Sequence, residues 1–315
     1  MKKKSNTYIM LSLLIGMICL ATRAVAQDKQ HPFLCFKDTR LGVRFETNID
    51  NDSKFETNDA NLKLKEMHNT NLLLELEGVI AKSKRAESAI VLGAGGSRIS
   101  IANDYIAPMY SFTTNQDIDG DTYTREYHDL KMCQKSVGYS FTMSLAFRER
   151  LRLYKDFGLY ADLGMNGMML TSMKMDDMYG DANVKGRYGQ YGDIVLDGAW
   201  GNNGFGMTYL RNANTTKDIK VNSFVPVPFV RLGLDWKFST KIKSGWITLG
   251  ATYQSAMDDL LKYNENNGVT DSDNAIVYNT MNGTESKENV RSVLGSYSKS
   301  RLRGIMINFG VYLFF

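Results

Sequence analysis

The sequence predicts an all-β protein in which about eight antiparallel strands close into a transmembrane β-barrel, with ten strands as the alternative count. Three observations support this fold class. Apolar and polar side chains alternate over stretches longer than an ordinary strand, short turns alternate with long polar connections, and the only long apolar run lies at the N-terminus. The content of 17 Tyr, 27 Gly and only 4 Pro also suits closely paired strands, since proline donates no ladder hydrogen bond.

The N-terminal segment has the features of a cleavable secretory signal. Lysines at positions 2–4 precede the apolar run YIMLSLLIGMICLA, and the small residues AVA come just before Gln27. This run is too short and wrongly flanked for a stable membrane helix. We expect cleavage after Ala26, so that residues 1–26 are the signal, residues 27–39 form a periplasmic segment and residues 40–315 form the barrel.

Removal of the signal changes the net charge and the cysteine count. The chain has 38 basic and 34 acidic residues, and the signal contains four basic residues and no acidic one, which leaves 34 of each. A formally neutral mature chain gives no support for a nucleic-acid partner. The mature chain retains Cys35 and Cys133, for which one disulfide and two free thiols are equally consistent expectations.

The clearest strand pattern lies in residues 137–170. From Val137 to Phe147, apolar side chains alternate with small polar ones, and after the turn YKDF the alternation resumes at Leu159. A period of two is typical of a strand with two different faces, so this stretch predicts a hairpin. The same pattern predicts further strands at 229–238, 247–254 and 305–315 and, more weakly, at 41–47, 72–80 and 88–101.

Long alternation is compatible with two architectures. A soluble sandwich buries its apolar faces, whereas a membrane barrel turns them to lipid and encloses the polar ones. Several of the predicted strands exceed the roughly 9–11 residues that cross a bilayer, and the polar faces mix small residues with Arg and Asp. We expect paired charges inside the barrel, because unpaired buried charge is costly; the expected residues are Arg148, Asp162, Arg231 and Asp235.

The connections give the barrel an orientation. Short turns are expected at 82–87, 154–156 and 239–245, and long loops rich in Asn, Asp, Gly and Lys at 104–125, 173–222 and 258–299. Short periplasmic turns and long extracellular loops are typical of outer-membrane barrels. An even strand count then places both chain ends in the periplasm. Pro226 and Pro228 begin one predicted strand, and we expect them near the extracellular rim because neither donates a ladder hydrogen bond.

The C-terminal residues resemble the insertion signal of Gram-negative outer-membrane β-barrel proteins. The pattern consists of a polar residue, a glycine, two apolar positions and a terminal phenylalanine, and it is carried here by Asn308, Gly310, Leu313 and Phe315 with the spacing Asn-x-Gly-x-x-Leu-x-Phe. From Leu41 onward, the hairpin and loop pattern is similar to small porin-like barrels of the outer membrane protein β-barrel domain family. The resemblance implies an outer-membrane location, contact with membrane lipid, and recognition of the last strand by the barrel assembly machinery.

Several motifs partly resemble binding sites for metals or cofactors. DIDGD at 117–121 lacks the glycine and closing glutamate of a calcium loop, and LGAGGSR at 92–98 lacks the third glycine and the helix of a dinucleotide loop. A run of methionines suits apolar packing better than soft-metal binding. We therefore predict no metal or cofactor site; the methionines are Met165, Met168, Met169, Met173, Met175 and Met178.

Three tyrosines in the longest predicted loop form a candidate recognition surface. Tyr179, Tyr188 and Tyr191 are each followed by glycine and a polar residue, and tyrosine supplies contact area at low entropic cost. The alternative interpretation is a mobile loop with turn glycines.

The function expected from these patterns is a structural or surface-binding barrel whose long loops contact an unknown extracellular ligand. A small porin or transport channel is the first alternative, favoured if the strand count rises well above eight. A barrel-embedded lipid-modifying enzyme is the second, and it requires His128, beside Asp129, to meet a serine. No spacing singles out such a serine, so we predict no catalytic site and no enzymatic activity.

Overall fold

The computed structural model describes residues 38–113, 119–197, 205–212, 220–240, 244–262, 275–279, 285–288 and 297–314. Most of these residues lie in antiparallel β-strands, and the helical structure among them is a three-residue 3₁₀ turn, Gly189–Tyr191. In the described ranges no helix is both long and apolar enough to cross a membrane. The predicted signal (1–26), Cys35, all but residues 38–39 of the 27–39 segment, and Phe315 lie outside these ranges.

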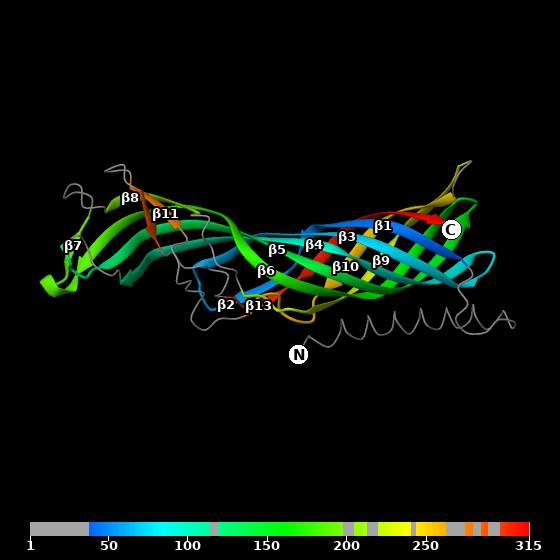
Figure 1. The fold of residues 1–315 in the computed structure, drawn as a ribbon, viewed down its shortest axis with the longest axis horizontal. Helices are drawn as coiled ribbons and strands as arrows, with labels where there is room; N and C mark the ends of the chain where they lie inside the picture. Colours follow the sequence, from blue (N-terminus) through cyan, green and yellow to red (C-terminus); the bar gives the residue numbers. More distant parts are fainter. Residues whose placement is uncertain are drawn as a thin grey trace.

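Eight strands form a closed antiparallel ring (Figure 1). Each strand pairs with the next in the order below, and the last pairs with the first. The strands are β1 (Thr39–Asn51), β3 (Leu62–Lys82), β4 (Ala86–Thr113), β5 (Thr124–Tyr154), β6 (Phe157–Tyr188), β9 (Val225–Ser239), β10 (Ser244–Ser255) and β14 (Arg303–Phe314). The predicted all-β class and the count of eight strands are confirmed, and each ring strand overlaps one of the predicted strand regions.

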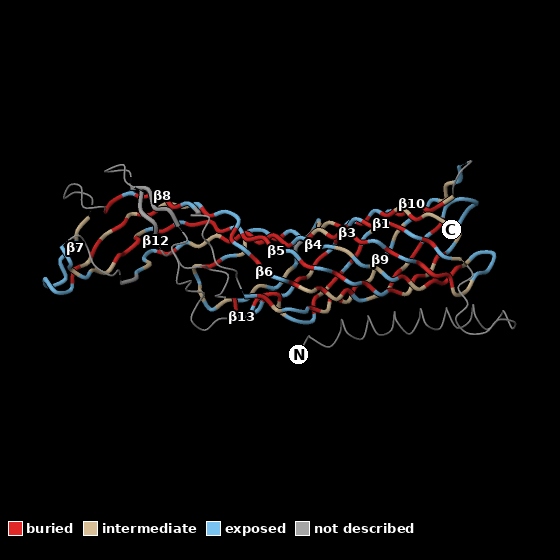
Figure 2. Tube along the Cα trace, viewed as in Figure 1, coloured by how far each residue is buried: buried red, intermediate tan, exposed pale blue. Residues whose placement is uncertain are grey.

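The period of two separates an apolar outer face from a polar inner face. On β5, Phe141, Met143 and Leu145 are 48%, 54% and 56% exposed, whereas the intervening Thr142 and Ser144 are 1% and 6% exposed. Successive side chains of a strand point to opposite faces, so the two sets lie outside and inside the ring. Figure 2 shows the same alternation of exposed and buried positions along the ring strands.

The short connections lie at one end of the ring. Residues 83–85 join β3 to β4 and residues 155–156 join β5 to β6, while β9 ends at Ser239, opposite Ser244 at the start of β10. The first turn is held by Ser83, whose amide donates to the carbonyl of Ala86 at 2.8 Å and whose Oγ accepts from the Ala86 amide at 3.0 Å. These positions agree with the three predicted short turns. We refer to this end as the turn end.

All three of the predicted long loops contain strands; in 258–299 the strands are short, at 275–279, 285–288 and from 297 onward. β4 continues to Thr113, β5 begins at Thr124, and β6 continues to Tyr188, so the prediction of loops over most of 104–125 and 173–222 is wrong. β5 and β6 have 31 and 32 residues, which at about 3.3 Å per residue gives strands of roughly 100 Å. These strands leave the ring and form an elongated extension (Figure 1). The polar composition was misleading because pairing with a neighbouring strand, rather than composition, holds these residues extended.

Shorter strands complete the extension and the rim of the ring. β8 (Gly206–Asn212) pairs with the far part of β6, β11 (Ala275–Asn279) with β8, β12 (Glu285–Glu288) with β11, and β7 (Ile194–Leu196) with the end of β6. β2 (Lys54–Thr57) and β13 (Tyr297–Arg301) form a separate two-stranded sheet. Apolar side chains fill the inner face of the extension, including Met132, Met178, Val184 and Leu210.

Pro226 and Pro228 lie at the start of β9, within the sheet. They pair with Gly167 and Met165 of β6, while the pairing of β9 with β10 begins only at Phe229. Each proline therefore has a single ladder neighbour, as expected for a residue that donates no backbone hydrogen bond. The carbonyl of Pro226 accepts from the Met257 amide at 2.9 Å.

Candidate functional site

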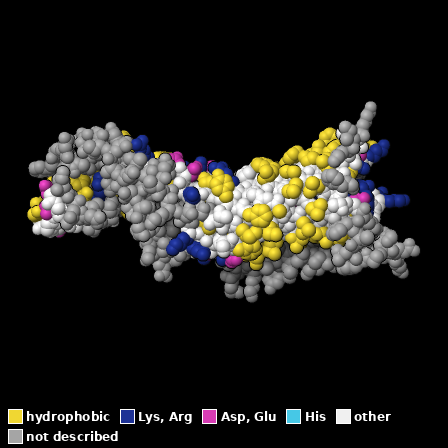
Figure 3. All heavy atoms as spheres, in the orientation of Figure 1, with side chains coloured by type: hydrophobic (Ala, Val, Ile, Leu, Met, Phe, Trp, Pro, Cys, Tyr) yellow, Lys and Arg dark blue, Asp and Glu magenta, His cyan; other side chains and the backbone are white. Residues whose placement is uncertain are grey.

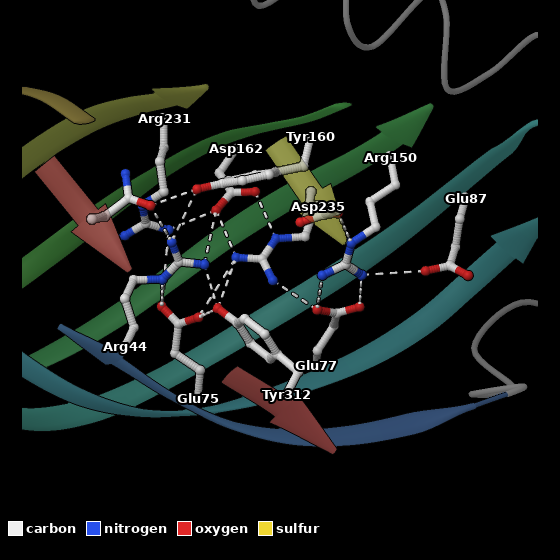
Figure 4. A network of polar contacts seen from close by, with 12 residues as sticks. Arg44, Glu75, Glu77, Glu87, Arg150, Tyr160, Asp162, Arg231, Asp235 and Tyr312 are labelled. Atoms are coloured by element: carbon white, nitrogen blue, oxygen red, sulfur yellow. Dashed lines mark hydrogen bonds and ion pairs between the residues drawn. The ribbon is translucent and has the colours of Figure 1, made fainter. Parts of the chain in front are cut away.

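The inner face of the ring near the turn end carries a buried network of charged side chains (Figure 4). Every member is at most 3% exposed. We call this set the inner network; its members are Arg40, Arg44, Arg148, Arg150, Arg231, Glu46, Glu75, Glu77, Glu87, Asp162 and Asp235. Five guanidinium groups face six carboxylates, so the formal charges nearly balance.

Asp162 is the centre of one half of the inner network. Strand pairing places it directly opposite Arg148 on β5 and Arg231 on β9. Arg148 donates to both of its oxygens, from Nε at 2.7 Å and from Nη2 at 2.8 Å, and Arg231 Nη1 donates to Oδ2 at 2.6 Å. The bidentate geometry is the strong form of an arginine–carboxylate pair. The period of two and the register together therefore build this triad.

Glu77 is the centre of the other half. Its carboxylate accepts from Arg40 at 2.5 Å, from Arg148 Nη1 at 2.7 Å and from Arg150 Nη2 at 2.8 Å. Arg150 also donates from Nε to Asp235 at 2.5 Å. Arg148 thus contacts both Asp162 and Glu77 and joins the two halves into one network.

Some bonds run across the inside of the ring. Arg44 on β1 donates to Glu75 at 3.0 Å and to Asn308 at 2.9 Å, on the two neighbouring strands, and reaches Tyr160 on β6 at 3.4 Å. Tyr160 in turn donates to Asn308 on β14 at 2.5 Å. Because β6 is adjacent to neither β1 nor β14, these contacts cross the interior. The ring is narrow enough for its own side chains to meet in the middle.

A layer of apolar side chains lies above the inner network, farther from the turn end. Met67, Ile99, Met168 and Val227 are each at most 2% exposed, and they lie on ring strands farther from the short turns than the charged residues. The segment 256–262 packs over this layer with Leu260 and Leu261, and the Leu260 amide donates to the Ser300 carbonyl at 2.7 Å.

The two layers leave little room for water inside the described part of the ring. Arg148, Asp162 and Arg231 have 0% exposure, so no water-sized sphere fits against them. An eight-stranded barrel is about the size that interior side chains fill. The described ring therefore contains no continuous column of water at the level of the inner network.

The four interior charges named from the sequence all lie in the inner network. Arg148, Asp162 and Arg231 contact one another directly, whereas Asp235 contacts Arg150. Sequence reasoning missed the other seven members. A signal was present for five of them, because in RLGVRFET (40–47) and LLLELEGVI (72–80) the charged residues alternate with Val, Phe and Leu. The alternation in these two segments is short, so the sequence predicts them only as weaker strands and does not by itself assign their charges to the inner face.

The three candidate recognition tyrosines do not share one loop. Tyr179 is exposed within β6, Tyr188 is buried at the end of β6, and Tyr191 lies in the following 3₁₀ turn. The Tyr188 ring stacks on Tyr123 with centroids 5.3 Å apart, and the Tyr191 hydroxyl donates to Asp121 at 2.7 Å. The expectation that these tyrosines lie in a loop is wrong for Tyr179 and Tyr188, because β6 extends through that region.

The described residues of the C-terminal pattern belong to β14, which closes the ring. Asn308 points inward and takes part in the cross-ring contacts with Arg44 and Tyr160. Leu313 pairs with Leu41 of β1 and Gly245 of β10. A Cβ atom on Gly310 would lie 2.7 Å from Thr248 Oγ1, so close packing favours glycine there. Asn308, Gly310 and Leu313 therefore each contribute to the structure of the ring.

His128 and the six methionines make ordinary ion-pair and packing contacts in the structure. His128 contacts Glu126 at 2.9 Å, and in the described part of the chain its side chain meets no serine. Glu126 also accepts from Arg187 at 2.6 Å, and this hydrogen bond lowers the pKa of Glu126. Among the methionines, Met165 is exposed, Met169 is half-buried, and Met168, Met173, Met175 and Met178 are buried in apolar packing.

No metal site emerges from the described residues: no group of three or more His, Cys, Asp or Glu is arranged to hold an ion. Part of DIDGD, including Asp117, lies outside the described ranges, and Asp119 is exposed. Cys133 is buried and forms no disulfide with a described residue. The chain matches no protein-family model, and no curated protein is detectably similar to it in sequence.

Proposed function

We propose that this protein is an integral outer-membrane β-barrel with a structural or surface-binding role. Its ring spans the bilayer, and its extended strands project from the outer surface of the cell. The observation that carries this proposal is the inversion of polarity: large apolar side chains cover the outside of the ring, while paired charges lie buried inside. A ring folded for water would place these groups the other way round.

A continuous apolar row around the ring supports contact with lipid. The row follows the strand pairing through seven of the eight ring strands, and its side chains are 41–56% exposed. We call it the apolar belt: Leu151, Leu159, Leu234, Leu249, Phe309, Phe45 and Leu72. An apolar surface of this extent is unfavourable in water, and Figure 3 shows such side chains gathered on the ring. A closed ring also satisfies the backbone hydrogen bonds, as lipid requires.

The polarity of the extension supports the orientation. Beyond the ring, the outward side chains of β5 and β6 become charged, with Lys131, Lys135 and Asp177 exposed. Charged side chains therefore join the outer face where the extension begins, alongside exposed apolar ones such as Ile106, Met109 and Tyr179. With the short turns in the periplasm, the extension projects into the medium outside the cell, where it offers a partner a large surface that carries both charged and apolar side chains.

The filled interior favours a structural or surface-binding role over conduction. Eight strands leave a lumen that side chains fill, and the inner network and the apolar layer both occupy it. The enzyme alternative lacks support, since His128 contacts Glu126 and no described serine. Membrane lipid and the barrel assembly machinery are the partners that accompany this proposal.

Site-directed thiol labelling tests the proposal. Cys35 and Cys133 are first replaced by Ser, and single cysteines are then introduced at Phe141, Leu145 and Leu232, with Lys135 as the matched outward position on the extension. In intact membranes a polar maleimide should label position 135 and leave the other three unmodified, because lipid excludes the reagent. Equal labelling at all four positions would favour a soluble assembly and overturn the proposal.

A further inference from the structure

A row of exposed aromatic side chains lies on the outer face of the ring at the turn end. Tyr154, Phe157 and Trp236 are 73%, 41% and 60% exposed. Strand pairing places Tyr154 opposite Phe157 and Phe157 opposite Trp236, so the three are neighbours on β5, β6 and β9. Tyr and Trp concentrate at the boundary between membrane and water. The row therefore marks a level at which headgroups would lie if the ring spans a bilayer.

Basic residues follow directly beyond this row. Lys84 and Arg85 lie in the turn before β4, Arg152 near the end of β5, and Lys155 in the turn before β6. A backbone hydrogen bond joins two of them, since the Arg152 amide donates to the Arg85 carbonyl at 2.8 Å. We call these four residues the basic edge. Lysine and arginine side chains gather at this end of the molecule in Figure 3.

The charge of the basic edge is largely uncompensated. In the described part of the chain, Lys84, Arg85 and Lys155 have no ion-pair partner within 4.0 Å, and Arg152 reaches only Glu87, at 4.0 Å. Glu87 already accepts from Arg40 at 2.7 Å. The inner network thus uses its carboxylates internally, and the exposed rim retains an excess of positive charge.

We infer that the basic edge binds the anionic headgroups of phospholipids in the leaflet that surrounds the turn end. This inference rests on the proposed function. Basic groups attract anionic lipid over about one Debye length, and the aromatic row beside the edge holds it at headgroup depth. A water-soluble or cell-wall polyanion would not require exposed aromatic side chains beside the basic groups, which is why we choose lipid.

Fluorescence quenching by brominated lipid tests the inference at a defined residue. The chain has three tryptophans; Trp200→Phe and Trp246→Phe leave only Trp236, which lies in the aromatic row. The protein is folded into phosphatidylcholine vesicles that carry a fixed fraction of brominated phosphatidylglycerol or, separately, brominated phosphatidylcholine. We expect about two-fold or greater enrichment of phosphatidylglycerol beside Trp236, and loss of that enrichment in high salt, which screens surface charge.

A triple variant and a matched control assign the effect to the basic edge. Lys84→Gln, Arg85→Gln and Lys155→Gln together should abolish the enrichment. The control variant Lys63→Gln, Lys131→Gln and Lys135→Gln removes the same charge from exposed positions on β3 and β5 of the described structure and should retain it. All six positions are exposed, so both variants should fold, as checked by heat-modifiable migration on a gel.

The outcomes separate the inference from the proposed function. Equal quenching by the two lipids, or enrichment that survives in the triple variant, would overturn the inference and leave the membrane barrel standing. Absence of quenching by either lipid in a folded protein would instead contradict the proposed function. Retention on purified peptidoglycan that the triple variant loses, with equal quenching by both lipids, would assign the edge to the cell wall.

Discussion

Loss of the Asp162 carboxylate should destabilise the ring. It accepts from Arg148 and Arg231, both fully buried, at 2.6–2.8 Å. Removal of one partner from a buried ion pair typically costs about 3–5 kcal/mol, since the other charge remains buried. Loss of Asp162 would leave two buried arginines without one of their carboxylate partners. Arg148 would still pair with Glu77, and Arg231 with Glu46.

We predict that Asp162→Ala lowers the free energy of unfolding by about 3–5 kcal/mol. The measurement is urea unfolding of the protein folded in vesicles, followed by tryptophan fluorescence. Asp181→Ala is the control, because Asp181 lies on the outward side of β6 beyond the ring. Equal stability of the two variants would show that the interior is hydrated and the charges are solvated.

Gly42 provides a second test at the residue scale, because the ring of Tyr312 occupies the space of its missing side chain. A Cβ atom on Gly42 would lie 2.3–2.8 Å from three ring carbons of Tyr312, while a Cβ on Gly96 would meet its nearest atom at 4.0 Å. The Tyr312 hydroxyl bonds to Arg148 at 3.2 Å, so the ring is not free to move.

We predict that Gly42→Ala destabilises the protein by about 1–3 kcal/mol, the usual effect of overpacking, whereas Gly96→Ala is neutral or nearly so. The same urea unfolding measurement compares the two variants. A neutral Gly42→Ala variant would mean that Tyr312 rearranges easily and that its bonds within the inner network contribute little.

At the scale of elements, β14 decides whether the ring closes. β14 is the last ring strand of the chain, and it pairs with β1, the first, on one side and with β10 on the other. The ring therefore closes only when β14 is in place. β14 also contributes Asn308 and Tyr312 to the interior. A defect in this strand should therefore affect assembly of the whole ring.

We predict that deletion of Phe315 leaves export intact and prevents insertion into the outer membrane. The resemblance of the C-terminus to an insertion signal motivates this expectation. The measurement is the amount of heat-modifiable protein in the outer-membrane fraction, with Asp181→Ala as a control for expression. Normal amounts of the truncated protein in that fraction would remove the proposed role of the terminal residue.

The elements also show where composition is a poor guide. Asp, Asn, Gly and Lys in 104–125 and 173–222 indicated loops, yet β4, β5 and β6 run through much of these ranges. Their inward positions carry Met132, Met178 and Val184, which weakly preserve the period of two. Bulges between His128 and Lys131 and between Lys135 and Ser136 shift the phase of that period. A simple alternation count therefore fails in these segments.

For the whole molecule, the filled interior makes a prediction about conduction. Purified protein in planar lipid bilayers should show no stable conductance steps of porin size, because the inner network and the apolar layer occupy the ring. A mid-sized porin measured in the same lipid is the control for successful insertion assays. Reproducible large steps from the unmodified protein would show an open, wet lumen and would make transport the better proposal.

The sequence by itself determined the ring strands and their two faces. Alternation in 137–170, 229–238 and 305–315 reads directly as strands because the side-chain period is a local property of an extended backbone. The same pattern placed Arg148, Asp162, Arg231 and Asp235 on polar faces. Only the tertiary structure decided which of these charges meet, since pairing depends on the register between strands.

Contacts across the ring could not be predicted from the sequence. Arg44 meets Tyr160 although they are 116 residues apart and on strands that are not neighbours. Their meeting depends on the strand number and stagger of the closed ring, which together set its width. The extension likewise depends on tertiary structure, because long polar strands stay extended only where a neighbouring strand supplies their hydrogen bonds.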